Sequence, residues 1–461
     1  MMQKIARRLS AARTDREPDA GFSIVEVLVA TLIFMLLSIG IAQATVTSIR
    51  LSGDQKHRVT ALSLAAGAID KARALIDPFK VLDETTTTTI DGITYTGVRQ
   101  TEWVSGNGTD IPCGGSGTAN LQVKRVNISV TWTGHLANAN AVTSNTELAP
   151  VGRINDPTQG TIIIAATRAD GTGAAGVTPT VTPVSGGATA LTTAPPVTDS
   201  DGCSYALRVT PGVYSVSLSK SGYIDINQNA TPSLSVTVAA GATTSAPFGY
   251  DLAAKFNMTY APGQPSGTKF ATTGADISFV NTYGTSWVSG NPASASLYPW
   301  GVGYVPIAGH YIAPTQLSPG CRSVDPSEWP AGTPAGGPAL AAGDHGAAVA
   351  AGPGASAAMT VPMGLLKVKS SKASASGTFL VATSATPIAG WGDPGCGTGM
   401  TYKFPAILAN TDTNIALPFG TWTISVTPSS GTATLTLTPL NNVVSGLVSG
   451  NTVMLDPRPA A

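Results

Sequence analysis

Few groupings of residues in this sequence have the types and spacing that chemistry requires. The segment GWGDPG at 390–395 matches the letters of a G-x-G-x-x-G dinucleotide fingerprint. That fingerprint needs a strand before the glycines and a helix after them, whereas Pro394 and its strand-rich surroundings indicate a turn. The histidines are isolated, and no pair has metal-ligand spacing (His57, His135, His310 and His345).

Carboxylates give no stronger signal. The segment DSDG at 199–202 lacks the ligand series of a 12-residue calcium loop. We expect a turn there, with Gly202 at a positive φ. Neither a P-loop nor a G-x-S-x-G elbow occurs. The sequence therefore predicts no enzyme, no metal site and no cofactor.

One glutamate interrupts an otherwise apolar segment of membrane length. From Phe22 to Ser48, Glu26 is the only ionisable residue, and the segment contains no proline. About 20 apolar residues span a bilayer as a helix, and a carboxylate at the bilayer centre costs about 2.5–3.5 kcal/mol. Basic residues before the segment predict a cytoplasmic amino end and place the chain after residue 48 outside (Lys4, Arg7, Arg8, Arg13 and Arg16).

Three interpretations of this segment compete. A secretory signal peptide has an A-x-A-like site in AQAT at 42–45, but the apolar run exceeds a usual h-region of about 7–15 residues. A plain membrane anchor gives no role to Gly21 or Glu26. The segment GFSIVEVLVA at 21–30 resembles the processing site of type IV pilins and pseudopilins. In that family a glycine precedes a phenylalanine, a glutamate is the fifth residue of the mature chain, and an apolar helix follows.

The resemblance implies that a prepilin peptidase cuts between Gly21 and Phe22 and methylates the new amino terminus at Phe22. It also implies that Glu26 faces the ammonium group of a neighbouring subunit in a filament, because burying either charge alone is costly. The expected partners are this peptidase, other pilin or pseudopilin subunits, the inner assembly platform and the membrane. The expected location is a single-pass membrane precursor with a short cytoplasmic leader, whose body lies outside the cytoplasm and enters a filament outside the cell.

Composition predicts a mainly β chain after one long amino-terminal α-helix. The 51 glycines and 33 prolines, together with abundant Thr and Ser, favour short strands joined by turns. The 26 basic residues balance 26 acidic ones, so no basic face indicates nucleic acid. Apolar residues at helical spacing predict that the helix continues to residue 77, before Pro78 (Leu62, Ala65, Ala66, Ile69, Ala72, Leu75 and Ile76).

A small pilin-like sheet is expected after the helix. The segments 93–104 and 121–134 read as strands, and 138–160 reads as a linker. In the second strand, apolar residues alternate with polar ones at the period of a half-buried strand (Val126, Ile128, Val130 and Trp132).

The rest of the chain reads as tandem β-modules. From Gly160 to Tyr223 the pattern, including PGVYSVSLSKSGY, resembles the carboxypeptidase-regulatory-like, prealbumin-type β-sandwich. The segment LPFGTWTISV at 417–426 repeats this plan, with Trp422 matching Tyr214. The predicted divisions are a leader (1–21), a helix (22–78), a pilin-like head with linker (79–158), a β-sandwich (159–252), an aromatic-rich β region with a flexible Gly/Ala loop at 331–358 (253–362) and a final β-sandwich (363–461).

Cysteines and aromatic residues leave alternatives open. The predicted bridge joins Cys321 to Cys396, and Cys113 and Cys203 form a second candidate pair; buried free thiols are the alternative. Five aromatic residues cluster within 287–311 (Trp287, Tyr298, Trp300, Tyr304 and Tyr311). They suit a sugar ring or a protein partner if exposed, but filling a sandwich core is the preferred interpretation.

The sequence therefore favours a minor pilin or pseudopilin of a type IV pilus-like or type II secretion-like filament, displaying β-modules at its surface or tip. The alternative is a surface adhesin or glycan-binding protein delivered by a pilin-type helix, with a surface glycan or protein as its partner.

Overall fold

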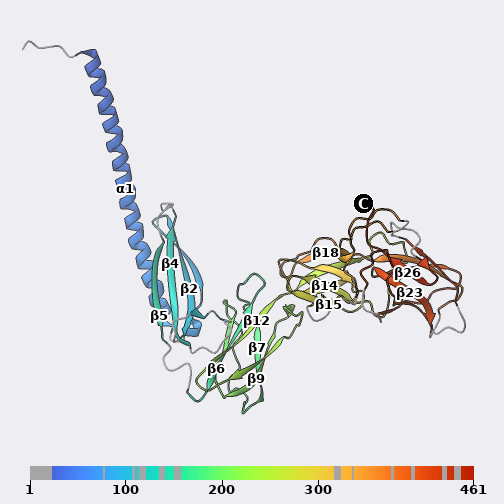
Figure 1. Cartoon of the computed structure of the whole chain (residues 1–461). Helices are drawn as coiled ribbons and strands as arrows, with labels where there is room; N and C mark the ends of the chain where they lie inside the picture. Colours follow the sequence, from blue (N-terminus) through green and yellow to red (C-terminus); the bar gives the residue numbers. More distant parts are fainter. Residues whose placement is uncertain are drawn as a thin grey trace, which may run out of the picture. The chain divides into compact units, whose positions relative to one another are not determined.

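The computed structural model describes most of the chain as one long helix followed by β-sheets (Figure 1). By contacts the chain divides into two compact units, Met1–Thr101 with Arg125–Leu148, and Glu102–Lys124 with Ala149–Ala461. The expected fold class, mainly β with one amino-terminal helix, is confirmed. The described residues are 23–75, 78–105, 110–111, 113, 121–133, 141–149, 157–315, 323–334, 337–374, 378–395, 400–427, 433–440 and 448–461.

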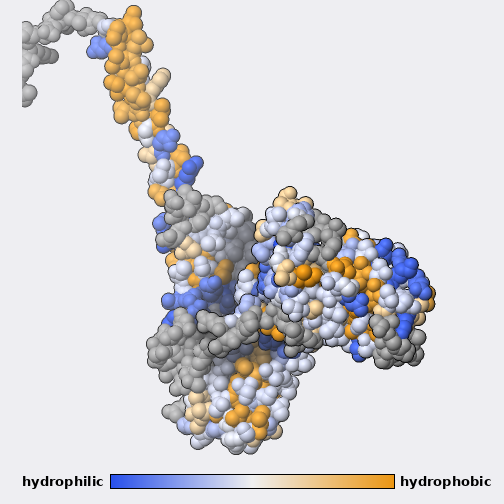
Figure 2. Space-filling model, turned by 45° about the vertical axis from the view of Figure 1, so that its right-hand side comes forward, coloured by the Kyte–Doolittle hydropathy of each residue, from blue (hydrophilic) through white to orange (hydrophobic). Residues whose placement is uncertain are grey.

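Helix α1 (Ile24–Ala74) has two parts with different surroundings, a first part over residues 24–49 and a second part over residues 50–74. Its first part is apolar and exposed on all sides. Figure 2 shows the apolar side chains along the face in view. The hydroxyls of Thr31, Thr45 and Thr47 donate to the carbonyl oxygens four residues earlier, so they add no unsatisfied polar group to this surface. In its second part, α1 buries one stripe that lies beside strand β5 (Val142–Leu148) (Figure 1).

The buried stripe corrects the predicted helix face. It consists of Ala61, Ala65, Ile69 and Ala72, whereas Leu62 and Ala66 are exposed. These buried positions follow each other at steps of four, four and three, which is one narrow face of an α-helix. The helix also ends earlier than predicted, because Leu75 has an extended backbone; Ile76 and Asp77 lie outside the described residues.

The buried stripe of α1 packs in the core of an antiparallel head sheet. The strand order is β1 (Glu84–Ile90), β2 (Ile93–Ser105), β4 (Leu121–Trp132) and β5, with β3 (Asp110–Ile111) paired to β2. The alternation predicted for β4 is confirmed, since its predicted inward residues are all buried (Val126, Ile128, Val130 and Trp132). The short helix η1 (Pro78–Lys80) connects α1 to the sheet.

Strand β5 corrects the predicted linker at 138–160. Residues 142–148 alternate between buried or half-buried and exposed positions, and Val142 joins the head core. The sequence VTSNTEL is too polar to signal a strand. Its pairing depends on α1 and β4, which supply the surface that its inward side chains cover.

Two facing sheets form the first sandwich. One has the order β10 (Tyr223–Asp225), β12 (Thr243–Leu252), β6 (Gly160–Thr167), β8 (Cys203–Val209), and the other β11 (Ser233–Val238), β9 (Gly212–Ser219), β7 (Thr178–Ser185). As predicted, β9 points its apolar side chains into the core (Tyr214, Val216 and Leu218).

The middle region contributes two further sheets to the second unit. Their strand orders are β16 (Ser294–Leu297), β13 (Ala254–Tyr260), β18 (Ser356–Val361), and β15 (Gly284–Val288), β14 (Ile277–Asn281), β17 (Val305–Ala308). The short helix η2 (Pro326–Glu328) follows β17 in the chain and precedes the Gly/Ala loop. That loop is not simply flexible, because Leu340 is buried and pairs with Gly332 and Ala460.

The final sandwich repeats the first in its opening strands. Strand β19 (Gly364–Ser370) pairs with β22 (Asp412–Leu417) as β6 pairs with β8, and β20 (Phe379–Ser384) pairs with β23 (Gly420–Thr427) as β7 pairs with β9. The modules then differ, because β24 (Leu435–Pro439) runs antiparallel to β19 while β12 runs parallel to β6. The remaining strands, β21 (Thr401–Lys403), β25 (Val448–Ser449) and β26 (Thr452–Leu455), extend the β20–β23 sheet.

Candidate functional site

Glu26 lies in the first turn of α1, on the exposed apolar surface. A carboxylate at this end of a helix interacts favourably with the partial positive charge of the unpaired backbone N–H groups. Of the described helices, α1 is long and apolar enough to cross a membrane. The predicted processing residues Gly21 and Phe22 lie outside the described residues, so cleavage and methylation stay predictions.

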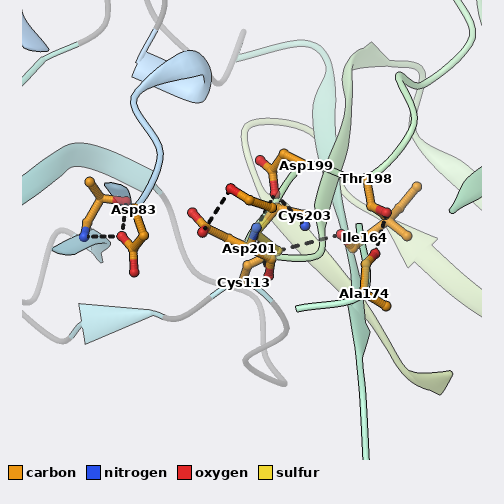
Figure 3. The surroundings of a disulfide bond; sticks show 10 residues. Asp83, Cys113, Ile164, Ala174, Thr198, Asp199, Asp201 and Cys203 are labelled. Carbon is orange, nitrogen blue, oxygen red and sulfur yellow. Dashed lines mark hydrogen bonds between the residues drawn. A yellow bond between two sulfur atoms is a disulfide. The ribbon is translucent and has the colours of Figure 1, made fainter. Parts of the chain in front are cut away.

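A disulfide joins Cys113, after β3, to Cys203 at the start of β8 (Figure 3). The two Cα atoms lie 5.7 Å apart, and the cysteines are 90 residues apart in the chain. This pair was the second candidate in the sequence. The first, Cys321 with Cys396, lies outside the described residues and stays a prediction.

A turn held by the side chain of Asp199 positions Cys203. Oδ1 of Asp199 accepts hydrogen bonds from the backbone N–H groups of Asp201, at 3.0 Å, and Cys203, at 2.9 Å (Figure 3). Gly202 has a φ of 77°, as predicted, and a Cβ there would lie 2.2 Å from the carbonyl oxygen of Ala166. Burial is the main reason that the pKa of Asp199 is raised, and the nearby charge of Asp201 raises it further.

The clustered aromatic residues divide between the two interpretations. Tyr298, Tyr304 and Tyr311 are buried, as core-filling predicts. The side chain of Trp287, in contrast, is 51% exposed, and Trp300 is half-buried. These two tryptophans lie at a surface hollow.

Tyr283 completes this aromatic surface and was missed in the sequence. It lies in the turn between β14 and β15, its side chain is 65% exposed, and its ring stacks on that of Trp300 with 3.9 Å between centroids and 15° between planes. Asn281 shapes the turn, because its Oδ1 accepts from the backbone N–H groups of Tyr283 and Gly284. An Asn three residues before a Gly is the available sequence signal for such a turn.

We call this hollow the Trp287 pocket. It has a volume of about 330 Å³ and is lined by Ile226, Asn227, Gln228, Asn281, Tyr283, Gly284, Thr285, Ser286, Trp287, Trp300 and Tyr304. Its volume is within the range of small-molecule sites. All of these residues belong to the second unit.

Hydrogen bonds fix the base of the pocket. Gln228 donates from Nε2 to Tyr304 Oη at 3.2 Å and accepts at Oε1 from the backbone N–H of Tyr298 at 2.7 Å. Tyr304 Oη in turn donates to the carbonyl oxygen of Tyr298 at 2.7 Å. Burial raises the pKa of Tyr304 to about 12, so its hydroxyl stays protonated at neutral pH. The base is therefore rigid and uncharged.

Solved structures that match this chain include the following two. The Bacillus anthracis TIE protein is 11% identical, with a TM-score of 0.17, over 76% of this chain and 68% of its own. A streptococcal ancillary pilin is 12% identical, with a TM-score of 0.17, over 44% of this chain and 69% of its own. No family model matches the chain, and no curated protein matches it.

Two of the histidines considered in the sequence are each paired with one aspartate. His310 lies 3.2 Å from Asp276, and His345 lies 2.8 Å from Asp325. Across the part of the chain that the structure describes, no group of three or more His, Cys, Asp or Glu side chains is placed to hold a metal ion. Residues 390–395 form turn and loop structure as predicted, and Asp393 accepts from the backbone N–H of Gly395.

Proposed function

We propose that this protein is a minor pilin or pseudopilin, made as a membrane-inserted precursor and assembled into a type IV pilus-like or type II secretion-like filament. The observation that carries the proposal is the division of α1 into an exposed apolar part and a part that packs on an antiparallel sheet. The proposed partners are a prepilin peptidase, the inner assembly platform, the membrane and other pilin subunits. The proposal assigns the protein no enzymatic activity.

The exposed part of α1 needs an apolar environment. Large side chains on every side of it are exposed, and Leu28, Phe34 and Leu36 are each more than half exposed. Each buried CH₂ group is worth about 0.8 kcal/mol, so a bilayer or a bundle of similar helices stabilises this surface strongly. A membrane holds it before assembly, and the filament core holds it afterwards.

Glu26 gives the assembled helices a preferred stagger. Within an apolar bundle an unpaired carboxylate is strongly unfavourable, and removing one partner of a buried pair typically costs about 3–5 kcal/mol. The ammonium group of a neighbouring mature chain is the proposed partner. Only the stagger that joins these two charges satisfies both.

The second unit favours a minor rather than a major subunit. It carries two β-sandwiches and the middle sheets beyond the head. A filament in which every subunit displayed this mass would be crowded, whereas a tip or an occasional surface position leaves room for it.

The Glu26→Ala variant tests this function in the producing cells. We expect normal processing and membrane insertion, but at least tenfold less subunit in sheared filaments, since ~1.4 kcal/mol already changes an equilibrium tenfold. Asp70→Ala is the matched control, because Asp70 is an exposed carboxylate on the second part of α1. Wild-type amounts of Glu26→Ala in filaments would rule out the pairing.

A further inference from the structure

We propose that the Trp287 pocket binds a neutral saccharide. This inference goes beyond the filament function and does not depend on it, because every lining residue belongs to the second unit and none to α1. It rests on the exposed aromatic rings, the absence of charge in the lining and one unsatisfied hydroxyl.

Two aromatic faces are presented to solvent at the pocket. Tyr283 uses one face to stack on Trp300, which leaves its other face open at 65% exposure of the side chain. Trp287 contacts His310 with a centroid distance of 4.7 Å and keeps half of its surface exposed. Tyr283, Trp287 and Trp300 line the same hollow, and exposed apolar surface that is grouped in this way marks binding sites more often than single exposed rings do. The C–H faces of a pyranose ring cover such surfaces while its hydroxyls remain at the edges.

The lining contains no charged side chain. Apart from the aromatic rings, it presents amide and hydroxyl groups, and Ile226 is its one aliphatic side chain. A phosphate, a nucleic acid or an acidic glycan would be bound without a compensating cation, which is unfavourable. An apolar peptide side chain would place its surface against the amides of Asn227, Gln228 and Asn281. A neutral, hydroxyl-rich ligand satisfies both the rings and the amides.

Ser286 has an unsatisfied hydroxyl at this site. Its Oγ atom is buried and has no hydrogen-bond partner among the residues with described positions, although Ser286 lines the pocket. A hydroxyl can both donate and accept, and rotation about χ1 moves it between staggered positions. A sugar hydroxyl at the pocket edge supplies the missing partner. Asn281 also lines the pocket; the turn occupies its Oδ1, and its side-chain amide carries two N–H donors in addition.

The test uses the full chain in detergent and neutral hexasaccharides of glucose, mannose and N-acetylglucosamine, with a heparin hexasaccharide as the charged comparison. Binding is followed by tryptophan fluorescence and calorimetry. We expect saturable binding of at least one neutral hexasaccharide and none of heparin. Trp287→Ala and Tyr283→Ala should each weaken binding about tenfold or more, which corresponds to ~1.4 kcal/mol.

Two further variants keep the proposal falsifiable. Phe379→Ala removes another half-exposed aromatic ring on β20, outside the pocket, and should bind like wild type. Ser286→Ala should fold normally and weaken binding several-fold. Loss of binding in Phe379→Ala as well, tighter binding of heparin, or no saturable binding of any neutral hexasaccharide would overturn the proposal. Because Glu26→Ala leaves the pocket intact, it should bind saccharide normally whatever its effect on assembly.

Discussion

Tyr214 and Trp422 occupy equivalent places in the two sandwiches. Tyr214 Oη donates to the carbonyl oxygen of Thr210 at 2.8 Å, and Trp422 Nε1 donates to that of Pro418 at 2.9 Å. Each bond spans four residues and closes the connection into the strand that carries the aromatic ring. Each strand begins at a glycine of positive φ, 154° at Gly212 and 132° at Gly420. These hydrogen bonds therefore hold the backbone in the same conformation before the strand in both modules.

This equivalence predicts that the two connections stabilise their modules separately. Tyr214→Phe should cost about 1–3 kcal/mol, because Thr210 and the backbone N–H of Thr189 lose a buried partner. Hydrogen exchange should accelerate in β6–β12 while β19–β26 stay protected. Trp422→Phe should give the reverse pattern. Ser215→Ala, on the outward face of β9, is the control; equal effects on both modules would contradict this account.

The second prediction concerns the packing of α1 on the head sheet. Ala65 is fully buried and Ala66 is exposed. Ala65→Leu should destabilise the head by about 1–3 kcal/mol, because the added methylene groups overpack the core. Ala66→Leu adds the same atoms without crowding. Limited proteolysis of β1–β5 in full-length protein measures the difference, and similar cleavage rates for both variants would count against the packing described.

The third prediction concerns the Cys113–Cys203 bridge. Replacing both cysteines with serine should lower the free energy of unfolding of the first sandwich by up to about 4–5 kcal/mol in the chain-entropy model for a loop of this length. Non-reducing peptide mapping should recover the linked pair and, separately, Cys321 linked to Cys396. Recovering Cys113 and Cys203 as separately alkylated thiols would exclude their bridge.

The fourth prediction follows from the raised pKa of Asp199. Its folded state binds a proton more tightly than the unfolded chain, so the charged carboxylate destabilises the fold above the raised pKa. This destabilisation is relieved as the pH falls through the raised pKa towards the ordinary Asp value. Asp199→Asn keeps an acceptor at Oδ1. The free energy of unfolding of Asp199→Asn relative to wild type should be greatest at neutral pH and decline on acidification, as unfolding measured at several pH values would show. A difference that grows in acid would contradict the raised pKa.

Much of the fold could be predicted from local patterns. The alternation in β4 and the Gly-aromatic-aliphatic string shared by β9 and β23 are properties of short segments. Strand β5 could not be predicted this way, because its polar sequence pairs only where α1 and β4 already provide a surface. The helix face was predicted too broadly, since hydropathy alone cannot choose between Ala65 and Ala66.

Of the two candidate sites, one could be recognised in the sequence and the other could not. Glu26 is recognised in the sequence because one charge within an apolar run needs an explanation. The Trp287 pocket depends on the approach of Tyr283 to Trp300 and of the 226–228 loop to both. Those approaches come from tertiary packing. The sequence therefore identified the tryptophans without showing which of them are exposed.

The most direct test of the central claim is the mass of the mature protein extracted from membranes. The pilin account predicts a chain that begins at Phe22 and carries one N-methyl group, and predicts that Gly21 replaced by a bulky residue leaves unprocessed precursor. A mature chain that begins at Thr45, as signal-peptidase cleavage after AQA would produce, would contradict it.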